Sequence, residues 1–284
     1  MAAGPIVTFC LFMFLCGGIQ MIFVISPAKA LDFSTPAPCV DYTQADFLQN
    51  AAQLIDILRQ KSPAEVAALM KLSDKLAALN AARYESWSLP FTPDNAKQAL
   101  FAFNGDVYEG LDAATLTVDN WYWLQDHLRI LSGLYGILRP LDLIQAYRLE
   151  MGSRLATPAG KNLYAFWDDT LTQALAQLLS QQQQAGQSEA TLVNLASEEY
   201  AKAVRFERLG YRVVSPVFED WKDGKYRIIS FYAKRARGMM CRYAAQQQLQ
   251  TVEALSGFAL DGYAFGLWRN EDTPVFRRKL AQAG

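Results

Sequence analysis

The basic residues between positions 225 and 242 are the clearest candidates for chemistry in this sequence. These eighteen residues contain no Asp or Glu and six cations, which are Lys225, Arg227, Lys234, Arg235, Arg237 and Arg242. The whole chain carries 27 Lys and Arg against 28 Asp and Glu, so its formal net charge is -1. Because a guanidinium group donates two parallel hydrogen bonds to two phosphate oxygens, this local excess of positive charge predicts phosphate or nucleic-acid binding. The alternative is a solvated basic face that acids from elsewhere in the fold balance.

A helix is expected from about residue 234, because apolar residues recur there at helical spacing. These residues are Ala236, Met239, Met240 and Tyr243. On such a helix Arg235 and Arg242 align on one side, since they are seven residues apart. Lys234 and Arg237 are three residues apart and share another side.

A second candidate lies at residues 132–140, where two glycines interrupt a stretch that we expect to be helical. Gly133 and Gly136 would form a tight turn between two helices, the plan of a helix-hairpin-helix, which offers backbone N–H groups to DNA phosphates. Arg129, Arg139 and Arg148 flank the turn. An ordinary corner between two helices is the alternative, and the glycine spacing favours it slightly.

Polar residues scattered through otherwise apolar stretches form a third group of candidates. They are Ser26, Lys29, Ser73, Asp74, Lys75, Asn80, Arg83, Asp106, Tyr108, Arg148, Glu150, Asn194, Ser197 and Glu198. Several follow expected strands, where binding and catalytic residues often lie. The carboxylates among them could pair for acid–base chemistry if the fold gathers them. Helix caps and salt bridges explain them equally well.

The histidine and cysteine content argues against several kinds of enzyme and metal site. His127 is the only histidine, and its aromatic neighbours predict a packed structural residue rather than a catalyst. Four cysteines are present, Cys10, Cys16, Cys39 and Cys241, without a CxxC pair. We therefore expect no disulfide framework and no zinc or iron ligand set. No cofactor is expected.

The elements around these residues predict an α+β fold, a single helix-rich mixed domain with a small sheet and a helix-hairpin-helix-like element. Helices are expected in several pieces over 42–103, over 116–150 with the break at 132–140, over 161–185 and from 234. Strands are expected at 21–27, 191–196, 212–218 and 225–232. Asp223 and Gly224 predict a hairpin turn between the last two strands.

The first twenty residues raise a separate question. Residues 6–25 contain no charge and resemble a marginal membrane span or a signal peptide. However, no Lys or Arg precedes this apolar run, and Met21 opens a second segment that suits a buried strand ended by Pro27. Composition alone leaves both interpretations open.

Several segments resemble the YaaA peroxide-stress family. They are residues 21–33, with the sequence Ser-Pro-Ala-Lys, and residues 72–83, 103–111, 127–142, 147–152, 194–200 and 228–238. The likeness covers nearly everything after Met21, and it departs in the first twenty residues and near Trp268. It implies a YaaA-like domain over residues 21–280, with residues 1–20 as a mistaken start or an appended extension. It also implies a cytoplasmic location without stable membrane association.

The family resemblance further implies survival of hydrogen peroxide, lowering of free iron, and DNA binding through a basic cleft and a helix-hairpin-helix. We therefore expect a non-enzymatic protein that binds duplex or branched DNA and protects it from iron-dependent oxidative damage. The expected DNA-binding residues are Lys29, Lys75, Arg83, Gly133, Gly136, Arg148, Lys234, Arg235, Arg237 and Arg242. The alternative is an enzyme that acts on a nucleotide or a nucleic-acid base, with Asp74, Asp106, Glu150 or Glu198 beside the same cleft. The sequence identifies no protein partner.

Overall fold

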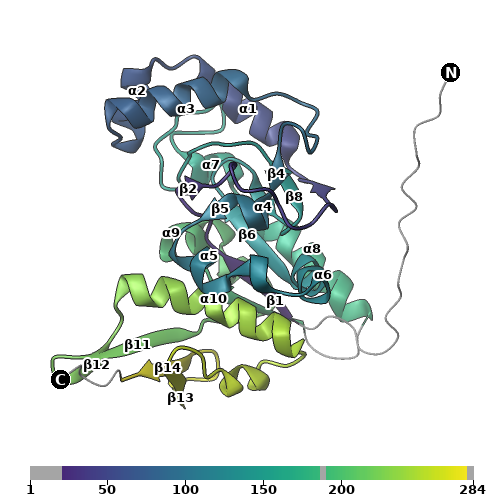
Figure 1. The fold of residues 1–284 in the computed structure, drawn as a ribbon, viewed down its shortest axis with the longest axis vertical. Helices are drawn as coiled ribbons and strands as arrows, with labels where there is room; N and C mark the ends of the chain where they lie inside the picture. The colour runs from purple at the N-terminus through teal and green to yellow at the C-terminus, as the bar shows by residue number, and fades with distance from the viewer. Residues whose placement is uncertain (1–20, 186–189, 280–284) are drawn as a thin grey trace.

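The computed structural model describes residues 21–185 and 190–279 (Figure 1). A helical lobe lies at the top, a central sheet in the middle, and a lobe with one long helix and a small sheet at the bottom. This architecture confirms the predicted helix-rich α+β fold. The first strand begins at Met21, as the sequence predicts, whereas the expected extension of residues 1–20 lies outside the described residues.

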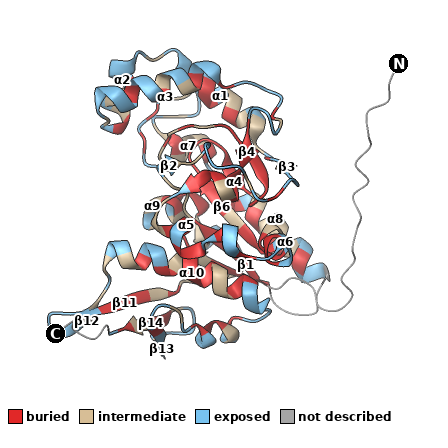
Figure 2. Cartoon of the chain, in the orientation of Figure 1, coloured by how far each residue is buried: buried red, intermediate tan, exposed pale blue. Residues whose placement is uncertain are grey.

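The central sheet has five strands in the order β10-β9-β1-β6-β7. Their bounds are Met21–Ile25 for β1, Leu128–Ser132 for β6, Gly136–Leu138 for β7, Thr191–Leu195 for β9 and Arg212–Val214 for β10. β1 lies in the middle and is parallel to β6 and β9, and β10 is parallel to β9. Every residue of β1 is buried, because the layer is covered on both faces (Figure 2).

The upper lobe consists of α1 (Leu48–Arg59), α2 (Pro63–Met70) and α3 (Asp74–Ser86). The start of α2 is a capping box, in which Ser62 and Glu65 each accept a hydrogen bond from the other's backbone N–H. Only residues 71–73 separate α2 from α3, so the two helices form a helical hairpin. The sequence predicts both helices, but we did not expect a hairpin here.

Two small sheets lie between the upper lobe and the central sheet (Figure 1). β2 (Ala30–Leu31) pairs with β5 (Phe103–Asn104). β8 (Asp142–Ile144) lies between β3 (Thr43–Gln44) and β4 (Lys97–Gln98). These pairings hold the loop that follows β1 against residues far along the chain.

The remaining helices lie around the central sheet and in the lower lobe. The α-helices are α4 (Ala99–Ala102), α5 (Asp106–Leu111), α6 (Val118–His127), α7 (Leu163–Trp167), α8 (Thr170–Ala185) and α9 (Glu198–Ala201). The 3-10 helices are η1 (Ala113–Thr115), η2 (Lys202–Val204), η3 (Phe206–Arg208) and η4 (Glu253–Gly257).

The lower lobe combines α10 (Ser230–Gln247) with a four-stranded sheet in the order β12-β11-β14-β13. The strand bounds are Val217–Lys222 for β11, Lys225–Arg227 for β12, Tyr263–Trp268 for β13 and Pro274–Arg278 for β14. Asp223 and Gly224 have positive φ angles of 51° and 79° and form the predicted turn between β11 and β12. The expected strand over 225–232 is shorter than predicted, because α10 already begins at Ser230.

α10 reaches the body of the molecule by crossing α5 at very short range. A β-carbon at Gly238 would overlap the carbonyl oxygen of Val107, and one at Gly110 would overlap that of Arg235. Glycine on both helices therefore permits a backbone-to-backbone approach that a larger residue would prevent.

The prediction of a helix-hairpin-helix at residues 132–140 is wrong. The chain forms the antiparallel hairpin of β6 and β7, with Ile130 opposite Leu138 and Ser132 opposite Gly136. A short apolar run suits a buried strand as well as a helix, and pairing with β1 selects the strand. Gly133 and Gly136 are buried in this hairpin, where side chains at these positions would overlap the carbonyl oxygen of Leu149 and crowd Trp167. They are packing residues and do not form a phosphate-binding turn.

Candidate nucleic-acid interface

The carboxyl ends of β1 and β9 form the topological switch point of the central sheet. Along the chain, the parallel strands run from β1 to β6 on one side and then to β9 and β10 on the other. Loops leave such strand ends in opposite directions, and the crevice between them is where open α/β sheets bind ligands. Ser26 follows β1 here, and Ser197 follows β9 by two residues.

A pair of serines ties these two strand ends together. The backbone N–H of Ser197 donates a 2.8 Å hydrogen bond to Oγ of Ser26, and that hydroxyl donates to Oγ of Ser197 at 3.1 Å. The hydroxyl of Tyr108, on α5, donates to the carbonyl oxygen of Ser26. Both serines are half-buried.

Lys29 and Arg148 meet at Glu150. Nζ of Lys29 lies 2.7 Å from one carboxylate oxygen of Glu150, and Nη2 of Arg148 donates to the other at 3.1 Å. Lys29 is 63% exposed, whereas Arg148 and Glu150 are largely covered. Two positive charges thus share one carboxylate, and Lys29 is the more accessible of them.

α10 brings further cations to the same region. Lys234 lies 4.0 Å from Asp106, the first residue of α5, and Arg235 is exposed beside it. A β-carbon at Gly105, the residue before Asp106, would come within 3.4 Å of Cβ of Ala28, which is next to Lys29. These contacts bring Lys234 to α5 and bring Lys29 to Glu150, and a shared cleft lining stays a prediction.

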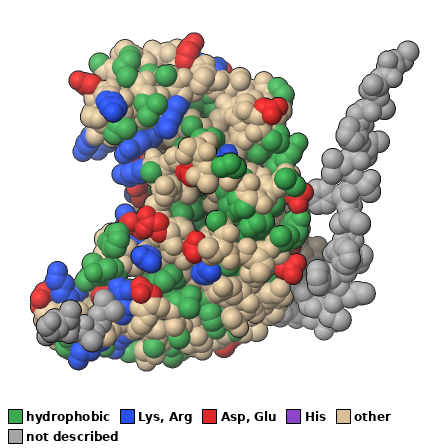
Figure 3. Space-filling model, in the orientation of Figure 1, with side chains coloured by type: hydrophobic (Ala, Val, Ile, Leu, Met, Phe, Trp, Pro, Cys, Tyr) green, Lys and Arg blue, Asp and Glu red, His purple; other side chains and the backbone are tan. Residues whose placement is uncertain are grey.

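Arg83 and Lys75 lie on α3 in the upper lobe. The hydroxyl of Tyr84, which follows Arg83, donates to the carbonyl oxygen of Arg148. This hydrogen bond fixes the carboxyl-terminal part of α3 to the segment that carries Arg148 and Glu150. Lys75 is exposed near the other end of α3, about 12 Å further along the axis. Figure 3 shows this face hollowed between the two lobes, with Lys and Arg side chains gathered along the upper wall.

Two of the expected binding residues, Arg242 and Arg237, are less accessible than Lys234 and Arg235. Nη1 of Arg242 donates to the carbonyl oxygens of Leu111 and Asp112 and to Oγ1 of Thr115, which holds the end of α5. Arg237 is half-buried, and burial lowers its pKa. Arg242 therefore helps to hold α10 against α5, and DNA binding by Arg242 and Arg237 stays a prediction.

The four candidate carboxylates are not gathered in one place. Glu150 and Asp106 lie on the cleft floor, each beside a lysine. Asp74 begins α3 in the upper lobe. Glu198 follows Ser197, but it lines a separate cavity of about 570 Å³ with Tyr164 and Lys202 among other residues. The four carboxylates therefore do not form a single acid–base cluster.

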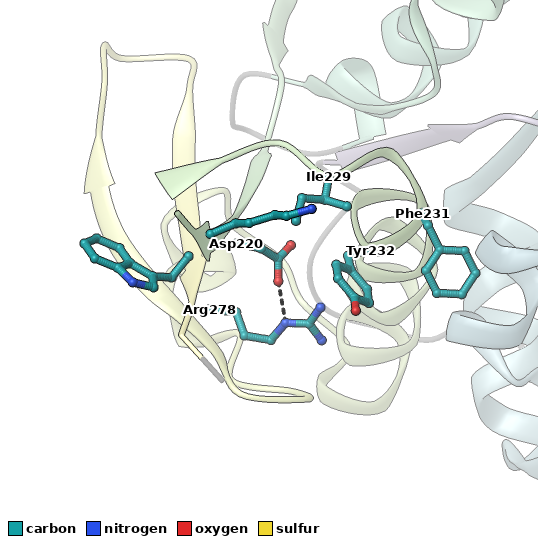
Figure 4. A pocket seen from close by; sticks show the side chains of 7 residues that line it. Asp220, Ile229, Phe231, Tyr232 and Arg278 are labelled. Carbon is teal, nitrogen blue, oxygen red and sulfur yellow. Dashed lines mark hydrogen bonds and ion pairs between the residues drawn. The ribbon is translucent and has the colours of Figure 1, made fainter. Parts of the chain in front are cut away.

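A second cavity, of about 420 Å³, lies in the lower lobe between β11 and α10. Arg278 donates to Asp220 at 2.6 Å, and its guanidinium lies 4.4 Å from the ring centre of Tyr232 and 4.5 Å from that of Tyr263 (Figure 4). Arg278 is only 4% exposed. This cluster stabilises the lobe. Phe231 also lines the cavity, and Figure 4 shows its ring turned away from Arg278.

His127 and the described cysteines lie in the interior. The ring of His127 stacks on Trp123 at 3.9 Å, and Nδ1 donates to the carbonyl oxygen of Trp123 in the neutral ring. Burial lowers the pKa of His127 to about 4. Cys39 and Cys241 are both buried and unpaired with each other. Within 21–185 and 190–279, no three His, Cys, Asp or Glu side chains come together as a metal site requires.

Sequence comparisons agree with the resemblance seen in the sequence. A family profile described as peroxide stress protein YaaA matches residues 21–267. The chain belongs to this family. It is 64% identical over 260 residues to UPF0246 proteins of Aromatoleum aromaticum and of Azoarcus sp. strain BH72, which covers 91% of this chain and 99% of each relative. A UPF0246 protein of Ralstonia pickettii is 58% identical over 261 residues, or 92% of this chain and 100% of that protein. Among the helices that the structure describes, none is both long and apolar enough to cross a bilayer.

Sequence reasoning missed Phe231, which is exposed on α10 close to Lys234 and Arg235. Its position three and four residues before Lys234 and Arg235 was the available signal, because these spacings put side chains on one helix face.

Proposed function

We propose that this protein binds duplex or branched DNA in the cleft between its lobes and thereby protects DNA during peroxide stress. Two local clusters support the proposal: Lys29 and Arg148 meet at Glu150, and Lys234, beside the exposed Arg235, reaches Asp106. Basic side chains from separate segments that line one groove are typical of proteins that follow a phosphate backbone.

The charge balance of the cleft supports this proposal. Lys29 and Arg148 share the single carboxylate of Glu150. Among the described residues, no Asp or Glu oxygen lies within 4.0 Å of a cationic nitrogen of Lys75, Arg83 or Arg235. These cations retain charge that phosphates can neutralise.

The helical hairpin of α2 and α3 offers a further phosphate contact on the upper wall. Ser73 precedes α3 but makes no side-chain hydrogen bond to its first amides. The thirteen-residue helix therefore begins with unsatisfied N–H groups, which attract anions. Lys75 in the first turn strengthens this attraction, and Asp74 beside it opposes it.

The link to peroxide follows from the family description and from chemistry. Iron and hydrogen peroxide generate radicals that attack DNA, so a bound protein shields the backbone it covers. An effect on free iron is implied by the family resemblance alone, and the described side chains offer no cluster that would hold the metal.

A binding titration tests the proposal. Duplex, single-stranded and four-way junction DNA are titrated at two salt concentrations with the wild type and with the double variant Lys234→Gln/Arg235→Gln. We expect the logarithm of the affinity to fall linearly with the logarithm of salt, and the double variant to flatten that slope by about 2 on duplex DNA. Arg212→Gln is the matched control, because Arg212 pairs with Asp272 at the amino-terminal edge of the sheet. Equal loss of binding in the control and the double variant would contradict a role for the cleft.

A further inference from the structure

Phe231 and Ile228 are large apolar residues that the lower lobe leaves exposed beside the cleft. Their exposed fractions are 51% and 60%. Single exposed apolar residues are common, so exposure alone carries no conclusion. Phe231, however, precedes Lys234 and Arg235 by three and four residues, which puts the aromatic ring and two cations on one side of α10.

This side of α10 borders the strand ends of the central sheet. Lys234 lies 4.0 Å from Asp106, and a β-carbon at the preceding Gly105 would meet Ala28, next to Lys29. Phe231 lies about 5 Å along the helix axis from Lys234. Phe231 is thus one helical turn from Lys234, the residue of α10 that reaches Asp106, and its ring also lines the lower-lobe cavity.

The recess in which Lys29 and Glu150 meet contains both donors and acceptors. Oγ of Ser197 accepts a hydrogen bond from the hydroxyl of Ser26, and its own hydrogen has no acceptor among the described residues. Lys29 adds donors, and the carboxylate of Glu150 adds an acceptor. A nucleobase presents a similar mixture of groups on its edge and an aromatic face for stacking. The carboxylates of Glu150 and Asp106 add acceptors that the N–H groups of a nucleobase can use and that a phosphate alone cannot.

We propose that this recess binds one nucleotide unit, with its base stacked on Phe231, its polar edge at Ser197 and Glu150, and its phosphate beside Arg235. The unit is either a free nucleoside monophosphate or an unpaired nucleotide in DNA. The second source rests on the proposed function, since it requires DNA in the cleft, whereas the first source does not.

Calorimetric titration of the full chain with deoxyadenosine 5′-monophosphate and with deoxyribose 5-phosphate tests the first source. The second is tested by a duplex with one bulged nucleotide, compared with the same duplex carrying an abasic bulge. We expect the base to improve affinity about tenfold in at least one of these two comparisons, in line with the usual contribution of stacking on an aromatic side chain.

Three variants assign that gain to the recess. Phe231→Ala is expected to abolish the advantage of the base, Phe231→Tyr to retain most of it because the ring is kept, and Val118→Ala to leave it unchanged. Val118 is the control because it is also 51% exposed but lies on α6. Urea unfolding midpoints show whether each variant is folded.

The inference is overturned if the base brings no gain in either comparison, or if folded Phe231→Ala retains the full gain. Binding of a fully paired duplex, measured at two salt concentrations, tests the proposed function separately. If that binding is absent while deoxyadenosine 5′-monophosphate binds through Phe231, the DNA-binding proposal fails and the nucleotide site stands.

Discussion

Gly238 of α10 lies directly against the carbonyl oxygen of Val107 in α5, so closely that a β-carbon at this position would overlap that oxygen. The same crossing positions Lys234 beside Asp106 on the cleft floor. The glycine therefore sets the place of the cations as well as the packing of the lobe.

Gly238→Ala should lower the free energy of unfolding by about 3 kcal/mol, because backbone atoms must separate to admit the methyl group. Urea unfolding followed by circular dichroism measures this loss. Gly224→Ala is the matched control, since Gly224 has a φ of 79° but nothing within 4 Å of the added carbon. That substitution should cost only about 1 kcal/mol of backbone strain. Similar losses for the two variants would contradict the close crossing.

Arg242→Gln and Arg235→Gln should have different effects, although both residues lie on the same side of α10. Arg242 holds the last carbonyls of α5, so its replacement should reduce stability by about 1 kcal/mol. Arg235 is exposed on the cleft side, so its replacement should leave stability unchanged and flatten the salt slope of DNA binding by about 1. Unfolding curves and salt titrations of both variants measure the two effects, and the opposite assignment would show that the Arg242 contacts do not matter.

Local patterns in the sequence were sufficient to predict the helices of the upper lobe and the outline of α10. Ser62 and Pro63 mark the start of α2 because capping is a property of neighbouring residues. The segment 128–138 was not predictable in this way. Its apolar residues suit a helix or a buried strand, and the choice depends on pairing with β1, about one hundred residues earlier in the chain.

The candidate site was predictable to a similar degree. The cations of α10 are visible as a charge run, so Lys234 and Arg235 could be named from the sequence. The internal role of Arg242 could not, because its partners Leu111 and Asp112 are about 130 residues away. Likewise, only the fold shows that Glu150 is the common partner of Lys29 and Arg148.

Glu150→Gln should tighten DNA binding at low salt. The substitution removes the one carboxylate that Lys29 and Arg148 share, so both cations become available to phosphates. We expect a steeper dependence of affinity on salt. The exposed pair with Lys29 contributes little to stability, whereas the loss of the largely covered pair with Arg148 should lower it by about 1 kcal/mol. Glu207→Gln, on η3 outside the cleft, is the control. Weaker binding by folded Glu150→Gln would mean that the carboxylate is needed to position the cations.

His127 should make the stability of the protein fall as the pH is lowered from about 6.5 towards 4. Burial lowers the pKa of the folded imidazole to about 4, whereas an unfolded histidine takes up its proton near pH 6.5. Between these values the unfolded chain binds the extra proton, so acidification favours unfolding, with a slope that approaches about 1.4 kcal/mol per pH unit. Above pH 7 the residue is neutral in both states, and its contribution to stability is constant.

His127→Phe keeps an aromatic ring against Trp123 but cannot titrate, so it isolates this contribution from that of the carboxyl groups. The difference between wild-type and variant free energies of unfolding should be constant above pH 7 and should shift in favour of the variant as the pH falls below 6.5. Because His127 is the only histidine in the chain, one imidazole proton resonance reports its titration directly by NMR. A folded-state midpoint near 6.5, or a pH-independent difference between the two proteins, would show that the ring is accessible to solvent.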